Sequence, residues 1–270
     1  MIFAILMPMM LAAGPETPAN ERTTIPLTDP TKAVHLKVHT INGGITVKGS
    51  AGKEVVVEVR SRGQGGEAGD PHRYPGMKIV PSRSSGLSIE EADNVVTVTT
   101  ESWRSPVDLV IEVPTRTSVD VGCINEGDIV IDQVQGDVVA QNVNGSIQLS
   151  AISGSALANT TNGDVKAGFL ALEAGRAMSF VTLNGNVEVS LPASTKADLN
   201  LGIGNEGDIY SDFPIATKAA PAAQKEAGTR GRDGRFVLKI DRAVRGTING
   251  GGAELTLKTF NGDILLRAVK

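Results

Sequence analysis

Apolar and polar residues alternate along most of this chain in short segments, a pattern typical of β-strands that bury one face. The segments Lys53–Arg60 (KEVVVEVR) and Val107–Val113 (VDLVIEV) show it most clearly. The second stops at Pro114, where a strand would lose a backbone donor. The same pattern predicts further strands at Ala33–His39, Gly44–Lys48, Gly86–Ile89, Asn94–Thr100, Phe236–Ile240, Glu254–Lys258 and Ile264–Arg267, with a turn at Glu90–Asn94. The pattern therefore predicts an all-β protein.

A glycine recurs every nine residues in the middle of the chain, at Gly127, Gly136, Gly145, Gly154 and Gly163. The third and fifth positions of each block are apolar or small, so they are expected to face inward. A regular period predicts that one small β unit stacks on copies of itself. We expect one continuous core to contain Ile129, Ile131, Val138, Ile147, Leu149, Val165, Val187 and Ile264.

The motif Asn-Gly-polar-aliphatic recurs at Asn144, Asn162, Asn184 and Asn261, and a variant with an inserted Glu occurs at Asn125 and Asn205. Asn-Gly is a strong turn dipeptide because both residues tolerate a left-handed backbone. We therefore expect a positive φ at one or both residues of each pair, including Gly145 and Gly163. Each of these glycines begins a coil of two short strands and two turns.

Stacking of these coils into two facing sheets predicts a β-solenoid or β-roll, and the alternative is an antiparallel β-sandwich. The interpretation gives one β-repeat domain over residues 23–270, with surface loops at 61–73 and 214–234. In this scheme Ile264–Arg267 closes the array at its end.

Residues 1–22 are interpreted as an export signal followed by a polar leader. The first thirteen residues (MIFAILMPMMLAA) form an apolar run that is too short to span a bilayer, and small residues follow it. Cleavage is expected near Ala13, although no Lys or Arg precedes the apolar run. No later stretch has the length of a transmembrane helix, so we expect an exported protein, either periplasmic or at the cell surface.

Composition narrows the possible partners and cofactors. A formal net charge of −4 argues against nucleic acid, which needs a concentrated basic face. The locally basic stretch Lys218–Arg245 is interpreted as a solvated loop. The single cysteine, Cys123, excludes an intrachain disulfide and is expected to be a buried thiol. We expect no cofactor.

The repeat supplies carboxylates but no recognisable catalytic or metal motif. Asp128, Asp137, Asp164, Asp208 and Asp263 each follow a repeat glycine, where they are expected to cap turns. The blocks lack the aspartate ladder of calcium-binding nonapeptide rolls, so we expect no calcium in the turns.

Other side chains with potential chemistry stand alone. His35 and His39 share one face of a strand but lie roughly 13 Å apart, too far to chelate a metal as a pair. His72 is expected in a loop. Trp103 is expected to cap the core, and the alternative is an exposed side chain that stacks on a ligand.

The repeated N-G-[DS]-[IV] units, together with Gly246–Arg267 (GTINGGGAELTLKTFNGDILLR), resemble the bacterial "putative adhesin" domains of unknown function. They are also similar to the related head domain of putative autotransporter adhesins. The resemblance covers about Ala33 to Lys270. It implies a solenoid-like β fold, an exported or envelope location and no known catalytic residues.

The leading hypothesis is a non-enzymatic, exported scaffold that binds an envelope or extracellular macromolecule, either a protein or a polysaccharide. One alternative is a polysaccharide-acting enzyme that uses Asp128, Asp137 and Asp164 along the array. Another is a structural or regulatory envelope module that binds a second protein. The sequence itself assigns no catalytic, metal or cofactor residue, and it does not identify the binding residues.

Overall fold

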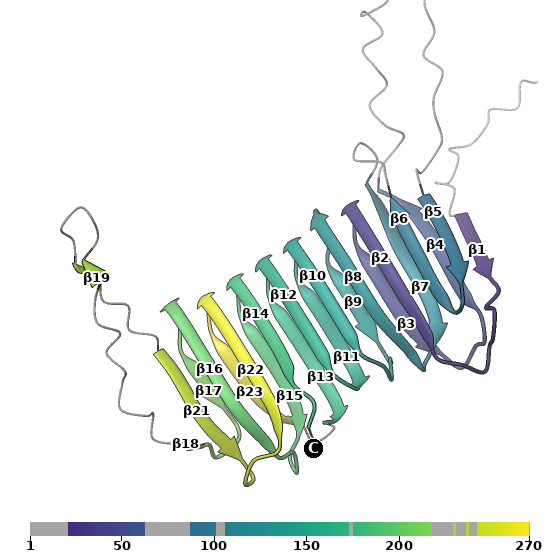
Figure 1. The fold of residues 1–270 in the computed structure, drawn as a ribbon. Helices are drawn as coiled ribbons and strands as arrows, with labels where there is room; N and C mark the ends of the chain where they lie inside the picture. Colours follow the sequence, from purple (N-terminus) through teal and green to yellow (C-terminus); the bar gives the residue numbers. More distant parts are fainter. Residues whose placement is uncertain are drawn as a thin grey trace, which may run out of the picture.

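The computed structural model describes residues 21–62, 87–100, 106–172, 175–217, 229–230, 236–237 and 242–269. These residues are all-β and form two large mixed sheets that face each other across one hydrophobic core (Figure 1). The export signal, Trp103 and His72 lie outside the described residues, as do most of the loops expected at 61–73 and 214–234.

Sheet 1 has ten strands, in the spatial order β1 (Glu21–Ile25), β4 (Val55–Ser61), β7 (Val107–Pro114), β3 (Ile45–Ser50), β9 (Ile129–Asp132), β11 (Ile147–Ser153), β13 (Val165–Ala171), β15 (Val187–Pro192), β23 (Ile264–Val269) and β17 (Ile209–Ser211). Sheet 2 has eleven, in the order β18 (Ala216–Thr217), β21 (Arg242–Ile248), β16 (Ala197–Glu206), β22 (Ala253–Asn261), β14 (Met178–Asn184), β12 (Ala156–Asn162), β10 (Val138–Asn144), β8 (Thr117–Asn125), β2 (Val34–Asn42), β6 (Val95–Thr100) and β5 (Leu87–Ala92). The short strands β19 (Thr229–Arg230) and β20 (Phe236–Val237) pair separately.

The predicted coil is confirmed in the centre of the molecule. From β8 to β15 successive strands alternate between sheet 2 and sheet 1, and each pairs in parallel with the strand two positions along the chain. Val138 pairs with Ala156 and Ile147 with Val165, which are both offsets of two nine-residue blocks. The two layers give a sandwich-like outline, but the antiparallel pairing of a sandwich occurs only towards the ends.

Both ends of the stack depart from the order of the chain. The coil β2–β3 lies between the coils β6–β7 and β8–β9. The coil β22–β23 lies between β14–β15 and β16–β17 (Figure 1). The expectation that Ile264–Arg267 closes the array is therefore wrong, because this segment lies inside sheet 1 with a parallel partner on each side.

All eight residues that were expected to face inward are buried. Ile129, Ile147, Val165, Val187 and Ile264 are each 0% exposed and lie in register in sheet 1, one above another along the stack. This aliphatic column follows directly from the period, since every coil places an aliphatic residue at the same inward position.

The asparagines of the repeat form a ladder along one edge of the stack. Asn162 Nδ2 donates to Asn144 Oδ1 at 2.8 Å, and Asn184 Nδ2 donates to Asn162 Oδ1 at 2.8 Å. Asn261 and Asn205 continue the ladder in the same way at 2.8 and 2.9 Å. The Asn of the motif therefore bonds to the neighbouring coil.

A second ladder lies inside the same edge, two residues before each asparagine. The hydroxyls of Thr160, Thr182 and Thr259 each donate at 2.8 Å to the carbonyl of a repeat glycine in the adjacent coil. Asn142 Nδ2 makes the equivalent bond at 2.8 Å and Cys123 Sγ at 3.1 Å. These bonds satisfy buried carbonyls that the turns leave unpaired.

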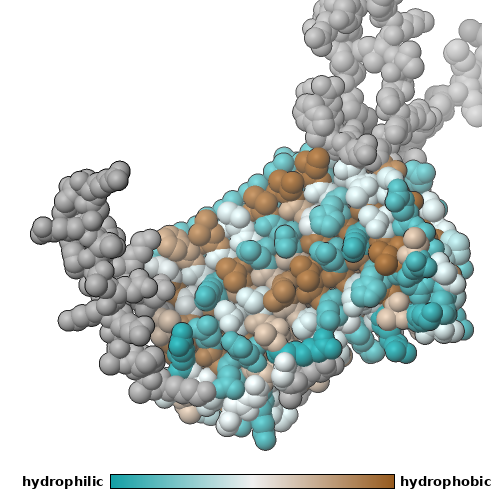
Figure 2. All heavy atoms as spheres, in the orientation of Figure 1, coloured by the Kyte–Doolittle hydropathy of each residue, from teal (hydrophilic) through white to brown (hydrophobic). Residues whose placement is uncertain are grey.

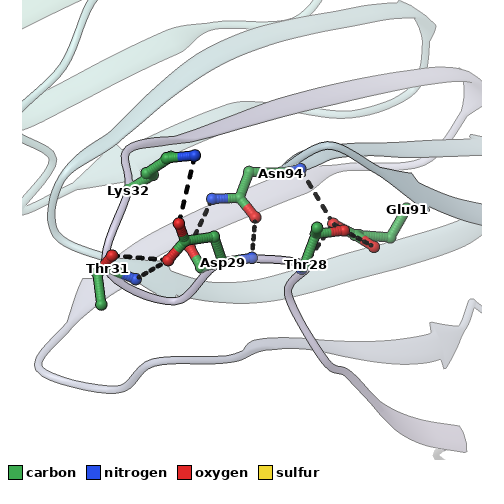
Figure 3. A network of polar contacts seen from close by, with 6 residues as sticks. All are labelled: Thr28, Asp29, Thr31, Lys32, Glu91 and Asn94. Atoms are coloured by element: carbon green, nitrogen blue, oxygen red, sulfur yellow. Dashed lines mark hydrogen bonds and ion pairs between the residues drawn. The ribbon is translucent and has the colours of Figure 1, made fainter.

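A polar network fixes the segment after β1 to the hairpin β5–β6 (Figure 3). The hairpin turn is tighter than expected, since only Asp93 and Asn94, both with positive φ, lie between the strands. Asn94 is buried; its side chain accepts from Asp29 N at 2.8 Å and donates to Asp29 O at 2.6 Å. Glu91 Oε1 accepts from Thr28 N and Asn94 N, both at 3.0 Å.

This network is expected to make the N-terminal end less stable in acid. The backbone N–H of Thr28, followed by its hydroxyl and Asn94 N, lowers the pKa of Glu91 from its ordinary value of 4.5. A carboxyl with a lowered pKa stabilises the fold fully above that ordinary value, and the stabilisation is lost as the pH falls through the lowered pKa. Glu91→Gln should therefore lower the melting temperature at neutral pH but not in strong acid.

Thermal unfolding of the wild type and the variant over a pH series measures this difference. Glu90→Gln, at the exposed neighbouring position, controls for the loss of one negative charge. A gap between wild type and Glu91→Gln that stays constant down to strong acid would contradict the assignment.

Candidate binding surface

The outer faces of the two sheets differ in charge. In the central strands β10, β12 and β14 of sheet 2, every outward side chain is uncharged; these are Val139, Gln141, Val143, Leu157, Asn159, Thr161, Ser179, Val181 and Leu183. The flanking strands of sheet 2 carry Lys37, Asp120, Glu254 and Lys258, and the outer face of sheet 1 carries Lys48, Asp132, Lys166, Glu188 and Arg267, of which Arg267 and Glu188 form an ion pair. The centre of sheet 2 is therefore the region that is easiest to remove from water.

An apolar stripe follows the carboxyl ends of the strands of sheet 2. It consists of the residue before the asparagine at the end of six neighbouring strands, which is apolar except in one: Ile41, Ile124, Val143, Thr161, Leu183 and Phe260. In the coil of Asn205 this residue is Gly204. Ile124, Val143, Leu183 and Phe260 are 48, 39, 46 and 47% exposed. Figure 2 shows apolar residues along one edge of the face and a second group in its middle. Outside the stripe, Leu157 on β12 is 46% exposed. Contiguous exposed apolar residues of this kind are typical of interaction sites.

A groove of about 500 Å³ lies beside this stripe, over β6, β2, β8, β10 and β12. Gly122 lines the groove between His39 and Gln141, its neighbours in register on β2 and β10. A β-carbon at Gly122 would lie 2.9 Å from His39 Cδ2, so the imidazole lies against the bare glycine. The imidazole of His39 thus takes the place of the side chain that β8 lacks at this point.

One buried hydroxyl near the inner ladder, that of Thr100, has no hydrogen-bond partner among the described residues. Thr100 lies beside Thr40 at the end of the ladder, is 6% exposed and lines the groove. Among the described residues, Thr100 Oγ1 is the buried side-chain N or O atom that lacks a hydrogen bond. A buried hydroxyl without a partner costs free energy, and Thr100 shares the inward face of β6 with Val96 and Val98, so an internal water is the partner that fits this atom.

The three candidate catalytic acids do not come together. Asp128 and Asp164 lie where the chain passes from sheet 2 to sheet 1, whereas Asp137 lies at the opposite turn. Asp128 Oδ1 accepts from Ser146 N and Asp164 Oδ1 from Asn186 N, both at 2.8 Å.

Asp137 is held by Ser155 and by an ion pair with Arg176. The Ser155 hydroxyl is the main cause of the lowered pKa of Asp137, with a smaller contribution from Arg176. These carboxylates therefore cap the turn of the next coil in the stack.

The other candidate residues take structural positions or stay apart. The thiol of Cys123 is buried as expected, and burial raises its pKa. His35 and His39 both lie on β2. Across the described ranges, no group of three or more His, Cys, Asp or Glu residues is placed to hold a metal ion. No helix in the same ranges is long and apolar enough to cross a membrane.

Two solved structures are similar to this chain. One is a putative cell adhesion protein from Clostridium sporogenes, at 8% identity and a TM-score of 0.47, covering 93% of this chain and 100% of that one. The other is a putative adhesin from Bacteroides fragilis, at 11% identity and a TM-score of 0.43, covering 92% and 97%. No protein-family model and no curated protein matches the chain. Both names agree with the family that the sequence resembles. With identities of 8 and 11% and TM-scores of 0.47 and 0.43, the names describe those two proteins and assign no function to this chain.

Sequence reasoning missed the outer face of sheet 2, although a signal for it is present. The residue before the asparagine is Ile, Val, Leu or Phe in five coils, one step out of phase with the inward positions. An apolar residue that recurs at an outward position is not required by the core, so it indicates a surface that is kept apolar for another purpose.

Proposed function

We propose that the protein is an exported, non-enzymatic scaffold that holds an envelope or extracellular macromolecule on the outer face of sheet 2. The observation that carries the proposal is the uncharged centre of this face. Strands β10, β12 and β14 expose part of the apolar stripe and no charge, whereas β13 and β15 of sheet 1 expose Lys166 and Glu188. A face with an uncharged, partly apolar centre can be desolvated at low cost, which suits the binding of a large partner.

The enzyme alternative receives less support from the geometry. Hydrolysis of a glycosidic bond ordinarily uses two carboxyl groups that flank it, within about 10 Å of each other. Asp137 lies at the opposite edge of the stack from Asp128 and Asp164. Asp128 and Asp164 share one edge with the coil of Ser146 between them, but the carboxylates of all three are engaged in hydrogen bonds that join coils. The sequence interpretation of a binding scaffold is therefore the one we retain.

Charge placed on the outer face of sheet 2 is expected to abolish binding to the cell envelope. The variant Leu157→Lys/Leu183→Lys puts two lysines at exposed positions outside the groove, so the fold should survive. Labelled wild type should bind saturably to isolated envelope fragments of the producing organism, and the variant should lose most of this binding.

The matched control is Gln148→Lys/Leu265→Lys, which adds the same charges to the outer face of sheet 1. It should bind as the wild type does. Equal losses in both double variants would indicate a general charge effect and contradict the assignment to sheet 2. Circular dichroism confirms that each variant is folded.

A further inference from the structure

We infer that the groove on sheet 2 binds an uncharged glycan strand, which lies across β6, β2, β8, β10 and β12. This inference rests on the proposed function and names the partner chemistry of the same face. The groove joins a row of polar side chains to a row of aliphatic ones, and it follows the direction in which the coils stack.

The polar wall consists of Thr99, His39, Gln141 and Asn159, which lie in register with Gly122 across five neighbouring strands. The aliphatic wall consists of Ile41, Ile124 and Val143, from the apolar stripe. A sugar ring has the matching character, with hydroxyls around its edge and C–H groups on its faces. Amides, hydroxyls and imidazole can both donate and accept, as sugar hydroxyls require.

The imidazole of His39 covers the position where β8 has no side chain, since a β-carbon at Gly122 would lie 2.9 Å from its Cδ2 atom. The polar wall therefore continues across β8 from Thr99 to Gln141 and Asn159.

The charge and spacing of the groove favour a glycan over other polymers. No Lys, Arg, Asp or Glu lines it, so it offers no counter-charge to an acidic or basic polymer. Its side chains repeat at the strand spacing of about 4.8 Å, whereas an extended peptide repeats its side chains on one face every 6.6 Å or so. One sugar of an extended β-linked glycan advances by a distance close to the strand spacing.

A second copy of this chain fits the groove less well. Packing two such faces together would bury Gln141, Asn159 and His39 against aliphatic or identical side chains at fixed positions. Buried polar groups without well-placed partners cost free energy, so the occupant has to supply its own hydrogen-bonding groups along the polar wall.

The test is calorimetric titration of the full exported chain with cello-, chito- and mannohexaose, and with oligogalacturonate as an acidic probe. At least one neutral hexaose should bind, and oligogalacturonate should not. The double variant Gln141→Ala/Asn159→Ala should raise the dissociation constant about tenfold or more, because it removes two side chains that donate hydrogen bonds to the glycan. Gln148→Ala, on the outer face of sheet 1, should leave it unchanged.

Each other outcome overturns the inference in a distinguishable way. Envelope binding that depends on Leu157 and Leu183, without binding of any neutral hexaose, would leave the proposed function standing and remove the glycan. Neutral glycan binding that is unaffected by Gln141→Ala/Asn159→Ala would remove the groove as its site. Tighter binding of oligogalacturonate, or a dimer that loses hexaose binding as it forms, would overturn the uncharged glycan as occupant.

Discussion

Replacing Ile147 with aspartate is expected to unfold the protein or to destabilise it by several kcal/mol. Ile147 is 0% exposed and lies between Ile129 and Val165 in the aliphatic column of sheet 1. A carboxylate at this position would lose its water and find no partner among the aliphatic side chains. Typical domains are stable by only about 5–15 kcal/mol, so one such loss is a large fraction of the total.

Urea unfolding followed by circular dichroism measures the effect. Gln148→Asp is the control, because the next residue of β11 points outward and is exposed. It should unfold close to the wild-type midpoint. Two variants with equal midpoints would mean that the inward and outward faces of β11 have been assigned incorrectly.

Replacing Gly145 with alanine is expected to cost more than the 1 kcal/mol or so that an unfavourable φ alone costs. Gly145 has a φ of 155°, and a β-carbon there would lie 2.2 Å from the carbonyl oxygen of Gly127 in the adjacent coil. That contact is with backbone, so relieving it requires the two coils to move apart. Separation would also strain the hydrogen bonds along this edge.

Gly168→Ala provides the comparison, since Gly168 lies within a strand and its β-carbon would come no closer than 3.8 Å to Leu149 O. This change should be nearly neutral. The difference in unfolding free energy between the two variants, measured in urea, is the expected signal. Equal tolerance of alanine at both positions would show that close stacking does not explain the glycine period.

The period and the alternation were sufficient to predict the coil, because both express local requirements of a strand and a turn. The repeat glycines are also required for a reason that the sequence does not show, which is the close approach of neighbouring coils. Gly127 and Gly136 have no positive φ, yet a β-carbon at either would lie within 2.3 Å of the backbone of the adjacent coil. The positive φ expected at Gly145 and Gly163 is confirmed.

The order of the coils could not be predicted from the motifs. Asn261-Gly262-Asp263-Ile264 carries the same turn chemistry as the other repeats, and its Asn bonds equally well to Asn184 and Asn205. Bonds that are interchangeable between coils do not specify which coils are neighbours. The groove was missed for a similar reason, because His39, Gln141 and Asn159 come from three strands that only the register brings together.

The inserted coil β22–β23 sets a condition on biosynthesis. A chain that emerges from a ribosome or a secretion pore delivers β16 and β17 before β22 and β23, which lie between them and the coil β14–β15. The stack therefore cannot grow coil by coil in the order of synthesis. Until β22 and β23 have emerged, β14 and β15 lack their final neighbours, and the exposed strand edges have to be kept from pairing wrongly in the meantime.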